Sequence, residues 1–467
     1  MQRITYMGAF FLMLFGFSPA VKAQYRMLRF EEFMTLVKGN HPLAKAAMLK
    51  SEEADAILQT ARGAFDPKLG AESAKKNFGG KNYYHLTGAG LKIPTWYGME
   101  LNAAYTDNTG SFLDPEKSTP ETGLIQAGLT LTAGQGLSID RRRADLKKAG
   151  FFSQQAEAER RLFLNDLLYD AGKAYWEWFT AYHTMKAAED AIALTAKRHS
   201  DVKSAASLGD RPPVDTLETY IQLQTRFIGL QQASMDNANG RAMLSAFLWT
   251  ENGIPLEADE YTIPVSFTEV RDSMTMVVSA NRDSLVTYHP AMAQYDGKIG
   301  QLKVDRRLKK EMLKPRLDLK YNALSEPLTD HPLGVYGSNN FQWGIDFSMP
   351  LFLRKERGDV RLASVKLQTA EMEMMAKSSV IGAKIQSARN EAEALLRQTG
   401  LYDQVTRDVK ALLDAELRMF EGGESSVFLV NSRETAYVNA RFKQIETLGK
   451  SRKAVLGVSF AEGNLGN

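Results

Sequence analysis

The 467-residue sequence contains no cysteine. Disulfide frameworks, thiolate metal sites, catalytic thiols and a lipid-modified N-terminal cysteine are therefore excluded. Histidine is scarce, and the six histidines form no His-x-x-x-His or Glu-x-x-His pattern with a convincing partner. Nucleotide-binding glycine-rich loops and the Gly-x-Ser-x-Gly motif of hydrolases are also absent. We therefore predict no catalytic residue, no metal site and no cofactor.

The sequence also lacks an excess of charge of one sign. Lys and Arg total 58 while Asp and Glu total 55, so the formal net charge of +3 gives no reason to expect nucleic acid as a partner. After the N-terminus no apolar run approaches the length of a membrane-spanning helix. If the chain enters a membrane, β-strands must carry it there.

The first 23 residues have the pattern of a secretory signal peptide. Arg3 precedes an apolar run of about 15 residues, and the small-residue pattern Val-Lys-Ala comes before Gln24. An uncleaved membrane anchor is the alternative, but this run is short for a bilayer span. We expect cleavage after Ala23 and export from the cytoplasm.

Two proline-free stretches of equal length dominate the rest of the chain. Arg143 to Gly209 and Arg357 to Gly423 each span 66 residue steps. Apolar residues recur in both at steps of three and four, as in helices packed side by side. Each helix would be about 100 Å long at the usual rise per residue. The equal lengths and matching ends indicate an internal duplication.

Other landmarks repeat with a different offset. His289-Pro290 follows His41-Pro42 by 248 residues, and Lys314-Pro315 follows Asp66-Pro67 by the same number. The long stretches are offset by only 214, so the first half has 34 additional residues between Pro67 and Arg143. These residues are enough for one extra β-hairpin and loop. The hairpin could enlarge a sheet, project from it or fold back on it.

The duplication predicts a first repeat over 24–250, with a helix, β-strands over 67–137 and a long helix pair over 143–250. A connector over 251–285 follows. The second repeat, over 286–467, has a helix, a β-hairpin over 315–352 and a long helix pair over 357–456. The predicted strands are about ten residues long and rich in Tyr, Leu and Gly, which is typical of transmembrane β-strands. A small soluble sheet is the alternative. One chain has too few strands to close a barrel, so oligomerisation is implied.

Several motifs, in this order and spacing, resemble the TolC family of outer-membrane efflux proteins. They are the two His-Pro pairs, Phe65 to Pro67, LSIDRRRADL at 137–146, GDRPPVDTLE at 209–218, FSMPLFLRKERGDV at 347–360 and GGESSVFLVNS at 422–432. The resemblance implies an α + β membrane protein in which the duplicated helix–hairpin–long helix–helix repeat forms a homotrimer. Its strands would share one β-barrel in the outer membrane, usually of twelve strands. Its helices would continue this barrel as a long periplasmic α-helical barrel.

The resemblance also implies a function without catalysis. The expected protein is a duct that exports small molecules or proteins across the periplasm and outer membrane. Its expected partners are outer-membrane lipid, an inner-membrane efflux or secretion pump, and a periplasmic adaptor protein that docks at the tip turns formed by Gly209, Gly422 and Gly423. An exported coiled-coil scaffolding protein without a pore is the alternative. The sequence does not indicate the cargo.

The turn after the first long stretch carries the candidate gate. Family members narrow their periplasmic entrance with acidic residues beside a small turn, and Arg211, Asp215 and Glu218 match that pattern. Asp215 and Glu218 are three residues apart and share a helix face. Arg211 could hold the closed state through a charge-assisted bond to a neighbouring helix.

Two interpretations of these acids remain open. They could form a cation-selective constriction in an oligomer. Alternatively, Asp215 could simply stabilise the first turn of its helix through the helix dipole. The second repeat has Leu429 and Ser432 at the equivalent places, so an acidic gate would come from the first repeat alone.

Overall fold

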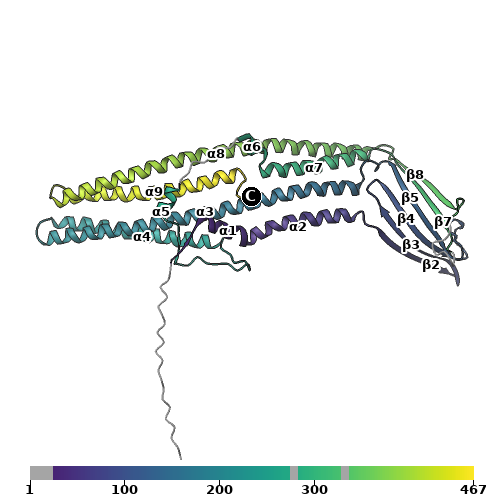
Figure 1. The fold of residues 1–467 in the computed structure, drawn as a ribbon, viewed down its shortest axis with the longest axis horizontal. Helices are drawn as coiled ribbons and strands as arrows, with labels where there is room; N and C mark the ends of the chain where they lie inside the picture. The colour runs from purple at the N-terminus through teal and green to yellow at the C-terminus, as the bar shows by residue number, and fades with distance from the viewer. Residues whose placement is uncertain (1–24, 274–281, 328–335, 467) are drawn as a thin grey trace, which may run out of the picture.

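The computed structural model describes residues 25–273, 282–327 and 336–466. The predicted signal peptide, residues 1–23, lies outside this part of the chain. The described residues form an elongated body with paired helices at one end and a β-sheet at the other (Figure 1). None of the helices in the described part combines the length and the apolar character that a bilayer span requires.

Each repeat contains one helix of 22 residues before its strands. α2, Pro42–Gly63, and α7, Pro290–Glu311, each contain 22 residues. The histidine before each proline caps its helix, because His41 Nδ1 accepts the Leu43 N–H and His289 Nδ1 accepts the Ala291 N–H, both at 3.1 Å. Proline fits the first helical turn, where no intrahelical donor is needed. A short helix, α1, Phe30–Asn40, precedes α2, and α6, Arg282–Thr287, precedes α7.

Each repeat then contains one very long helix and a shorter return helix. The long helices are α3, Arg141–Ser207, with 67 residues, and α8, Arg354–Glu421, with 68. The return helices are α4, Pro213–Ser245, and α9, Val427–Ala461. α3 begins two residues earlier than the sequence predicts, because the Asp140 carboxylate accepts the Arg143 N–H and caps the helix. α8 begins three residues earlier, directly after Leu353, which adopts a left-handed conformation with φ 50°.

The helices form a strip whose order differs between its two halves. In the half near the turns, α3 packs against both α4 and α9, and α8 packs against α9. In the half near the sheet, α3 packs against α2 and α7, and α7 packs against α8. The flanks of the strip are therefore α2 and α4 on one side and α8 on the other.

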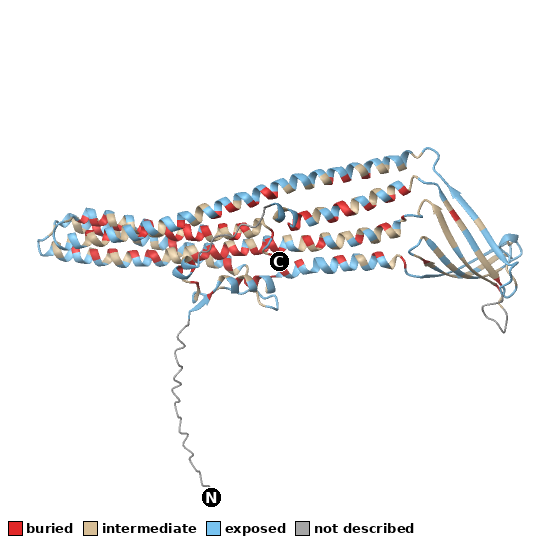
Figure 2. Ribbon diagram, turned by 45° about the horizontal axis from the view of Figure 1, so that its top comes forward, coloured by how far each residue is buried: buried red, intermediate tan, exposed pale blue. Residues whose placement is uncertain are grey.

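The main core lies where the helices of the two repeats run together. Tyr175, Trp178 and Phe179 of α3 are fully buried there beside Phe33 of α1. Figure 2 shows the buried residues concentrated along the packed helices, whereas much of the sheet is exposed. The aromatic side chains of α3 thus pack within the chain.

The first part of the predicted connector, residues 251–273, lies against this core, while residues 274–281 lie outside the described part of the chain. Its strand β6, Thr262–Pro264, pairs in parallel with β1, Arg26–Leu28. The following helix α5, Phe267–Asp272, buries Phe267 in the core, and Glu269 pairs with Arg29 at 2.8 Å. The connector thus ties the start of the chain to its middle.

In the described residues, six strands form one antiparallel sheet in the order β2-β3-β4-β5-β7-β8. Their bounds are β2 Lys68–Phe78, β3 Lys81–Pro94, β4 Met99–Thr109, β5 Leu124–Gly134, β7 Arg316–Ser325 and β8 Phe341–Ser348. A 3-10 helix, η1, Pro115–Lys117, lies in the loop before β5. The first repeat contributes four strands and the second contributes two. The additional hairpin is therefore part of the sheet itself, which selects one of the three placements that the sequence left open.

Candidate functional site

The two turns at the helical end have the same backbone structure. Gly209 and Gly423 follow α3 and α8 with φ values of +83° and +79°, a region that glycine adopts without strain. In the first turn the Asp210 N–H bonds to the Ala205 carbonyl, and in the second the Glu424 N–H bonds to the Met419 carbonyl. Both are Schellman motifs. Gly422 lies at the C-cap with φ −77°, so its conformation does not require glycine.

Arg211 joins the two turns. Its guanidinium donates to the carbonyls of Phe420 and Ser425 at 3.4 and 3.5 Å, and it lies 4.3 Å from the centre of the Phe420 ring. Phe420 belongs to the last turn of α8, so Arg211 bonds to a neighbouring helix of its own chain. Its other acceptor, the Ser425 carbonyl, lies in the turn that follows α8.

A ladder of polar contacts continues between α4 and α9. The Asn431 side chain donates to Glu218 at 2.7 Å, and the Gln222 side chain donates to Thr435 at 2.9 Å. Arg226 also donates to Thr435, at 3.2 Å. Glu218 is therefore engaged with the second repeat of its own chain. These contacts join the two helix pairs near their turns.

Asp215 lies in the first turn of α4 and is half-buried. Its backbone N–H bonds to the Pro212 carbonyl at 3.1 Å, and no side chain caps this helix. The position suits a carboxylate, because the helix dipole favours negative charge there. Asp215 and Glu218 share one side of α4, so both the gate and the dipole interpretation stay open.

A buried ion pair lies further from the turns. Arg198 of α3 and Glu434 of α9 are only 6% and 1% exposed, and they pair directly with each other. The Thr195 hydroxyl also donates to Glu434. Burial lowers the pKa of both Arg198 and Arg226, whereas the Glu434 carboxylate opposes this effect. The pair fixes α9 against α3 near the turns, nine residues before the end of α3.

Directly paired residues of neighbouring strands share a face of the sheet. Assigned in this way, one face of the sheet is apolar and the other is polar. On the apolar face one row of paired residues is Trp343, Tyr321, Leu129, Leu101 and Ile93, and a second is Ile345, Leu319, Leu131 and Met99. The intervening polar row is Gln342, Asn322, Gly128, Asn102, Lys92 and Lys68. This alternation is the pattern of a sheet with lipid on one side and water on the other.

Hydrogen bonds reinforce the polar face. The Asn102 side chain donates to Asn322 at 2.8 Å, although these residues lie on β4 and β7 with β5 between them. The bridge passes over Gly128, where an added Cβ would lie 2.1 Å from Asn322 Oδ1. Glycine at this position therefore allows the two amides to meet.

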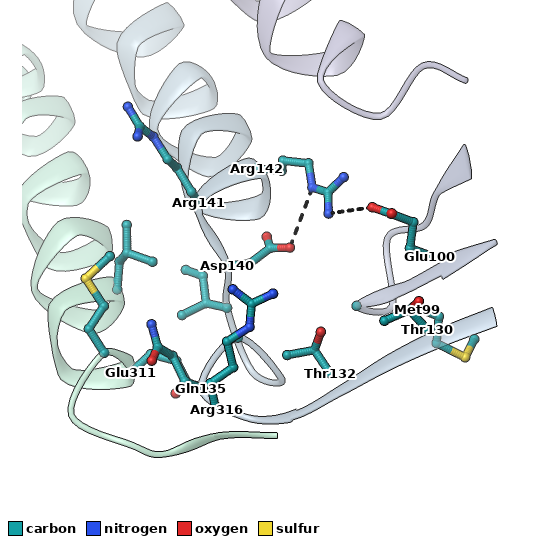
Figure 3. A pocket seen from close by; sticks show the side chains of 15 residues that line it. Met99, Glu100, Thr130, Thr132, Gln135, Asp140, Arg141, Arg142, Glu311 and Arg316 are labelled. Atoms are coloured by element: carbon teal, nitrogen blue, oxygen red, sulfur yellow. Dashed lines mark ion pairs between the residues drawn. The ribbon is translucent and has the colours of Figure 1, made fainter. Parts of the chain in front are cut away.

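A cavity of about 360 Å³ lies where the strands meet the helices. Figure 3 shows Arg142 between Asp140 and Glu100, with the nearest guanidinium-to-carboxylate distances at 3.9 and 3.5 Å. Arg316 lines the opposite side and pairs with Asp318 at 2.8 Å. The Arg142–Glu100 pair thus connects the start of α3 to β4, whereas Arg316 and Asp318 both belong to β7. In the described part of the chain, His, Asp and Glu residues nowhere form a cluster suited to a metal ion.

The turn residues are predictable from the sequence, but their partners are not. Phe420, Asn431 and Glu434 lie more than 200 residues from the groups that they contact. The repeat offset was the available signal, because Arg211 and Ser425 are separated by the same 214 residues as Gly209 and Gly423.

Comparison with known proteins locates relatives in structure alone. No family model and no curated protein matches the sequence. Among solved structures, the CmeC outer membrane channel of Campylobacter jejuni aligns with a TM-score of 0.63 and 14% identity over 93% of this chain and 85% of its own. CusC, described as a transmembrane channel, aligns at 0.66 and 13% over 94% and 92%. The open MtrE outer membrane channel of Neisseria gonorrhoeae aligns at 0.64 and 14% over 94% and 89%.

These three structures are channels rather than enzymes, and their similarity extends over both the helices and the sheet. The chain therefore has the fold of the outer-membrane efflux channels, as its resemblance to the TolC family predicts.

Proposed function

We propose that this protein is a trimeric outer-membrane duct through which cargo leaves the periplasm. The two-faced sheet carries the proposal, because its apolar rows suit lipid and its polar face suits a water-filled lumen. At about 1.5 Å per residue, α3 and α8 would extend about 100 Å from the membrane into the periplasm. The duct itself needs no chemistry, which agrees with the channel neighbours.

The flanks of the strip support assembly from several copies. α4 exposes Val214, Ile221, Ile228 and Met235 at steps of seven, and each is more than half exposed. α8 exposes Val405, Leu412 and Met419 at the same steps. An apolar stripe at this spacing favours packing against another helix.

The two stripes also match in level. Val214, Ile221 and Ile228 lie 1, 8 and 15 residues after the start of α4, while Met419, Leu412 and Val405 lie 2, 9 and 16 residues before the end of α8. α4 begins at one turn and α8 ends at the other, so the two helices run in opposite directions. α4 of one copy can therefore pair its stripe with α8 of the next copy, and three copies would close a ring.

The absence of native cysteine makes this pairing directly testable. Ile221→Cys combined with Leu412→Cys should give disulfide-linked dimers and trimers from the outer-membrane fraction after mild oxidation. These positions lie on opposite flanks of one chain, so a crosslink must join two copies. Ile221→Cys with Met372→Cys is the control, because Met372 is exposed on α8 but lies far from the turns. Monomers in the soluble periplasmic fraction would instead favour the scaffold without a pore.

At the turns, we propose that Asp215 and Glu218 line a constriction that Arg211 helps to keep narrow. Three copies would bring six carboxylates around one opening, which would favour cations. Asp215→Asn with Glu218→Gln should lower cation selectivity in planar bilayers. Asp210→Asn is the matched control, since this exposed acid lies in the turn itself. Unchanged selectivity would leave Asp215 as a group that only stabilises its helix.

The paired glycine turns, Gly209 and Gly422-Gly423, would form the docking surface for a periplasmic adaptor that connects the duct to an inner-membrane pump. Both turns project at the end farthest from the sheet (Figure 1). Crosslinkers placed at Leu208 and Glu424 should capture the adaptor in cells that express its pump. Capture only at positions near the sheet would contradict this placement.

A further inference from the structure

We infer that the β3–β4 hairpin widens the membrane wall, so that three copies form an eighteen-stranded barrel with a broad polar lumen. The inference rests on the proposed trimeric duct, and it goes beyond it by assigning a role to the additional residues of the first repeat. Three features of the hairpin support this role: its hydrogen bonds to neighbouring strands, its contacts with the helices and its alternation of apolar and polar residues.

The hairpin is hydrogen-bonded within the sheet along both of its sides. β3 pairs with β2 from Lys81 to Lys92, and β4 pairs with β5 from Met99 to Thr106. The two strands also pair with each other from His85 to Pro94. A flap that projected from the wall would leave one of these edges unpaired. β3 and β4 therefore separate β2 from β5 by two wall positions.

The turn between β3 and β4, residues 95–98, contacts the helical part of the chain. The Trp96 ring stacks on Phe65 at 4.3 Å with an interplanar angle of 6°. Glu100, just beyond the turn, pairs with Arg142 at the start of α3 (Figure 3). Gly98 approaches the Arg143 guanidinium so closely that an added Cβ would lie 3.2 Å from Nη2. These contacts place the turn at the same level as the other strand ends.

The hairpin also has the two faces of a membrane wall. Leu91, Ile93 and Leu101 continue the apolar rows of β5 and β7, whereas Lys92 and Asn102 continue the polar row. A hairpin in water on both sides would have no reason to maintain this alternation. The inserted strands are thus suited to lipid on one side and to the lumen on the other.

The sheet is open at β2 and β8, so closure requires other copies. A second copy is the occupant that fits, because β2 and β8 stand on the same flanks as α4 and α8, whose stripes match. Pairing β8 of one copy with β2 of the next would continue the antiparallel alternation. Six strands from each of three copies then give eighteen.

The width follows from sheet geometry. With strands about 4.8 Å apart and tilted by about 40°, eighteen strands close at a backbone diameter of about 36 Å and twelve at about 24 Å. Side chains remove about 5 Å on each side, which leaves lumens of about 26 and about 14 Å. The cross-section of the lumen is therefore about three times that of a twelve-stranded wall. Bulky polar cargo would meet its narrowest passage at the turns and not in the membrane.

The direct test is cryo-electron microscopy of the full-length trimer in lipid nanodiscs, with the wall strands counted. A functional test compares the intact chain with a variant that lacks residues 81–109, which joins β2 to β5 through the existing outer loop. A neutral polymer with a radius of about 10 Å is added on the side of the membrane opposite to the helices. It fits a lumen of about 26 Å but not one of about 14 Å, so it should lower the conductance of the intact channel only. Removal of residues 113–117, which lie in that loop and outside the wall, should leave polymer entry unchanged.

Eighteen wall strands and polymer entry confined to channels that retain the hairpin would support the inference. A conducting trimer with twelve wall strands, or equal polymer entry with and without the hairpin, would overturn it while the duct remained. A wild-type protein that forms neither trimers nor channels would overturn the proposed function together with the inference. The strand count needs only the wild-type protein, so poor folding of the deletion variant would not prevent the test.

Discussion

Replacing Glu434 with glutamine should weaken the junction between the two helix pairs more than any other single change of charge near the turns. Glu434 is only 1% exposed and neutralises Arg198, which is 6% exposed. Two nitrogen atoms of Arg198, Nε and Nη2, already have no hydrogen-bond partner in the described structure. Glutamine would keep the size of the side chain but would leave the guanidinium buried without its counter-charge.

Removing one partner of a buried ion pair costs about 3–5 kcal/mol, because the remaining charge has lost its hydration without compensation. We expect Glu434→Gln to lower the free energy of unfolding by an amount in that range. The double variant Glu434→Gln with Arg198→Met removes both charges, so it should recover at least half of the loss. On the exposed surface of α3, Glu189→Gln breaks a 2.9 Å pair with Lys186 and should cost at most about 1 kcal/mol.

Hydrogen exchange measured by mass spectrometry on the purified protein reports this junction locally. Peptides that contain Arg198 and Glu434 should exchange faster in the single variant, and the double variant should restore much of their protection. A loss of less than 1 kcal/mol for Glu434→Gln would refute the reasoning. A double variant as unstable as the single one would show that packing, and not charge, holds α9 against α3.

Three further predictions concern other parts of the chain. Burial lowers the pKa of His183 to about 4, so between pH 6.5 and 4 the unfolded chain binds a proton that the folded chain does not. The free energy of unfolding should therefore be constant above pH 6.5 and fall by up to about 3 kcal/mol towards pH 4. Thermal melting of His183→Gln should lack this part of the decline. Gly128→Ala should destabilise the sheet by about 1–3 kcal/mol through overpacking, whereas Gly344→Ala on the same face has open space and should not, as urea titrations of the folded barrel can establish. Ile228→Lys places a charge in the α4 stripe and should reduce the trimer fraction in analytical ultracentrifugation; an unchanged trimer fraction would contradict the proposed pairing of α4 with α8.

The large elements were predictable because they depend on local signals. Proline after His41 and His289, together with the glycines that end α3 and α8, marks helix boundaries through backbone chemistry alone. β2 was harder to recognise, since its sequence alternates only weakly and all eleven residues are exposed in one chain. Its backbone pairing with β3 defines it, and that pairing involves a different segment of the chain.

In the second half of α8 the apolar spacing does not mark the side that packs within the chain. Val405 and Leu412 lie at this spacing and are exposed, whereas the structure buries Thr406 and Leu413. Thr406 is accepted in the interior because its hydroxyl donates to the Tyr402 carbonyl at 2.7 Å. Periodicity in one sequence cannot distinguish packing within a chain from packing between copies, and the exposed residues form the proposed stripe.

The site was predictable in kind but not in partners. Arg211 was expected to bond to a neighbouring helix, whereas the identity of its acceptors, the Phe420 and Ser425 carbonyls, depends on how the two repeats are placed side by side. The bond from the Asn431 amide to Glu218 also depends on this placement. The second repeat has Ser432 in place of Glu218, so the repeat itself does not indicate this contact. Duplication predicts which segments meet, but divergence between the copies decides which side chains bond.

The central claim is that this chain forms a conducting duct in the outer membrane. Its most direct test is single-channel recording of protein purified from the outer-membrane fraction and reconstituted into planar lipid bilayers. The account predicts discrete, long-lived conductance steps from a trimer. A trimer that inserts into the bilayer and passes no ions, even after Asp215 and Arg211 are both replaced by alanine, would contradict it.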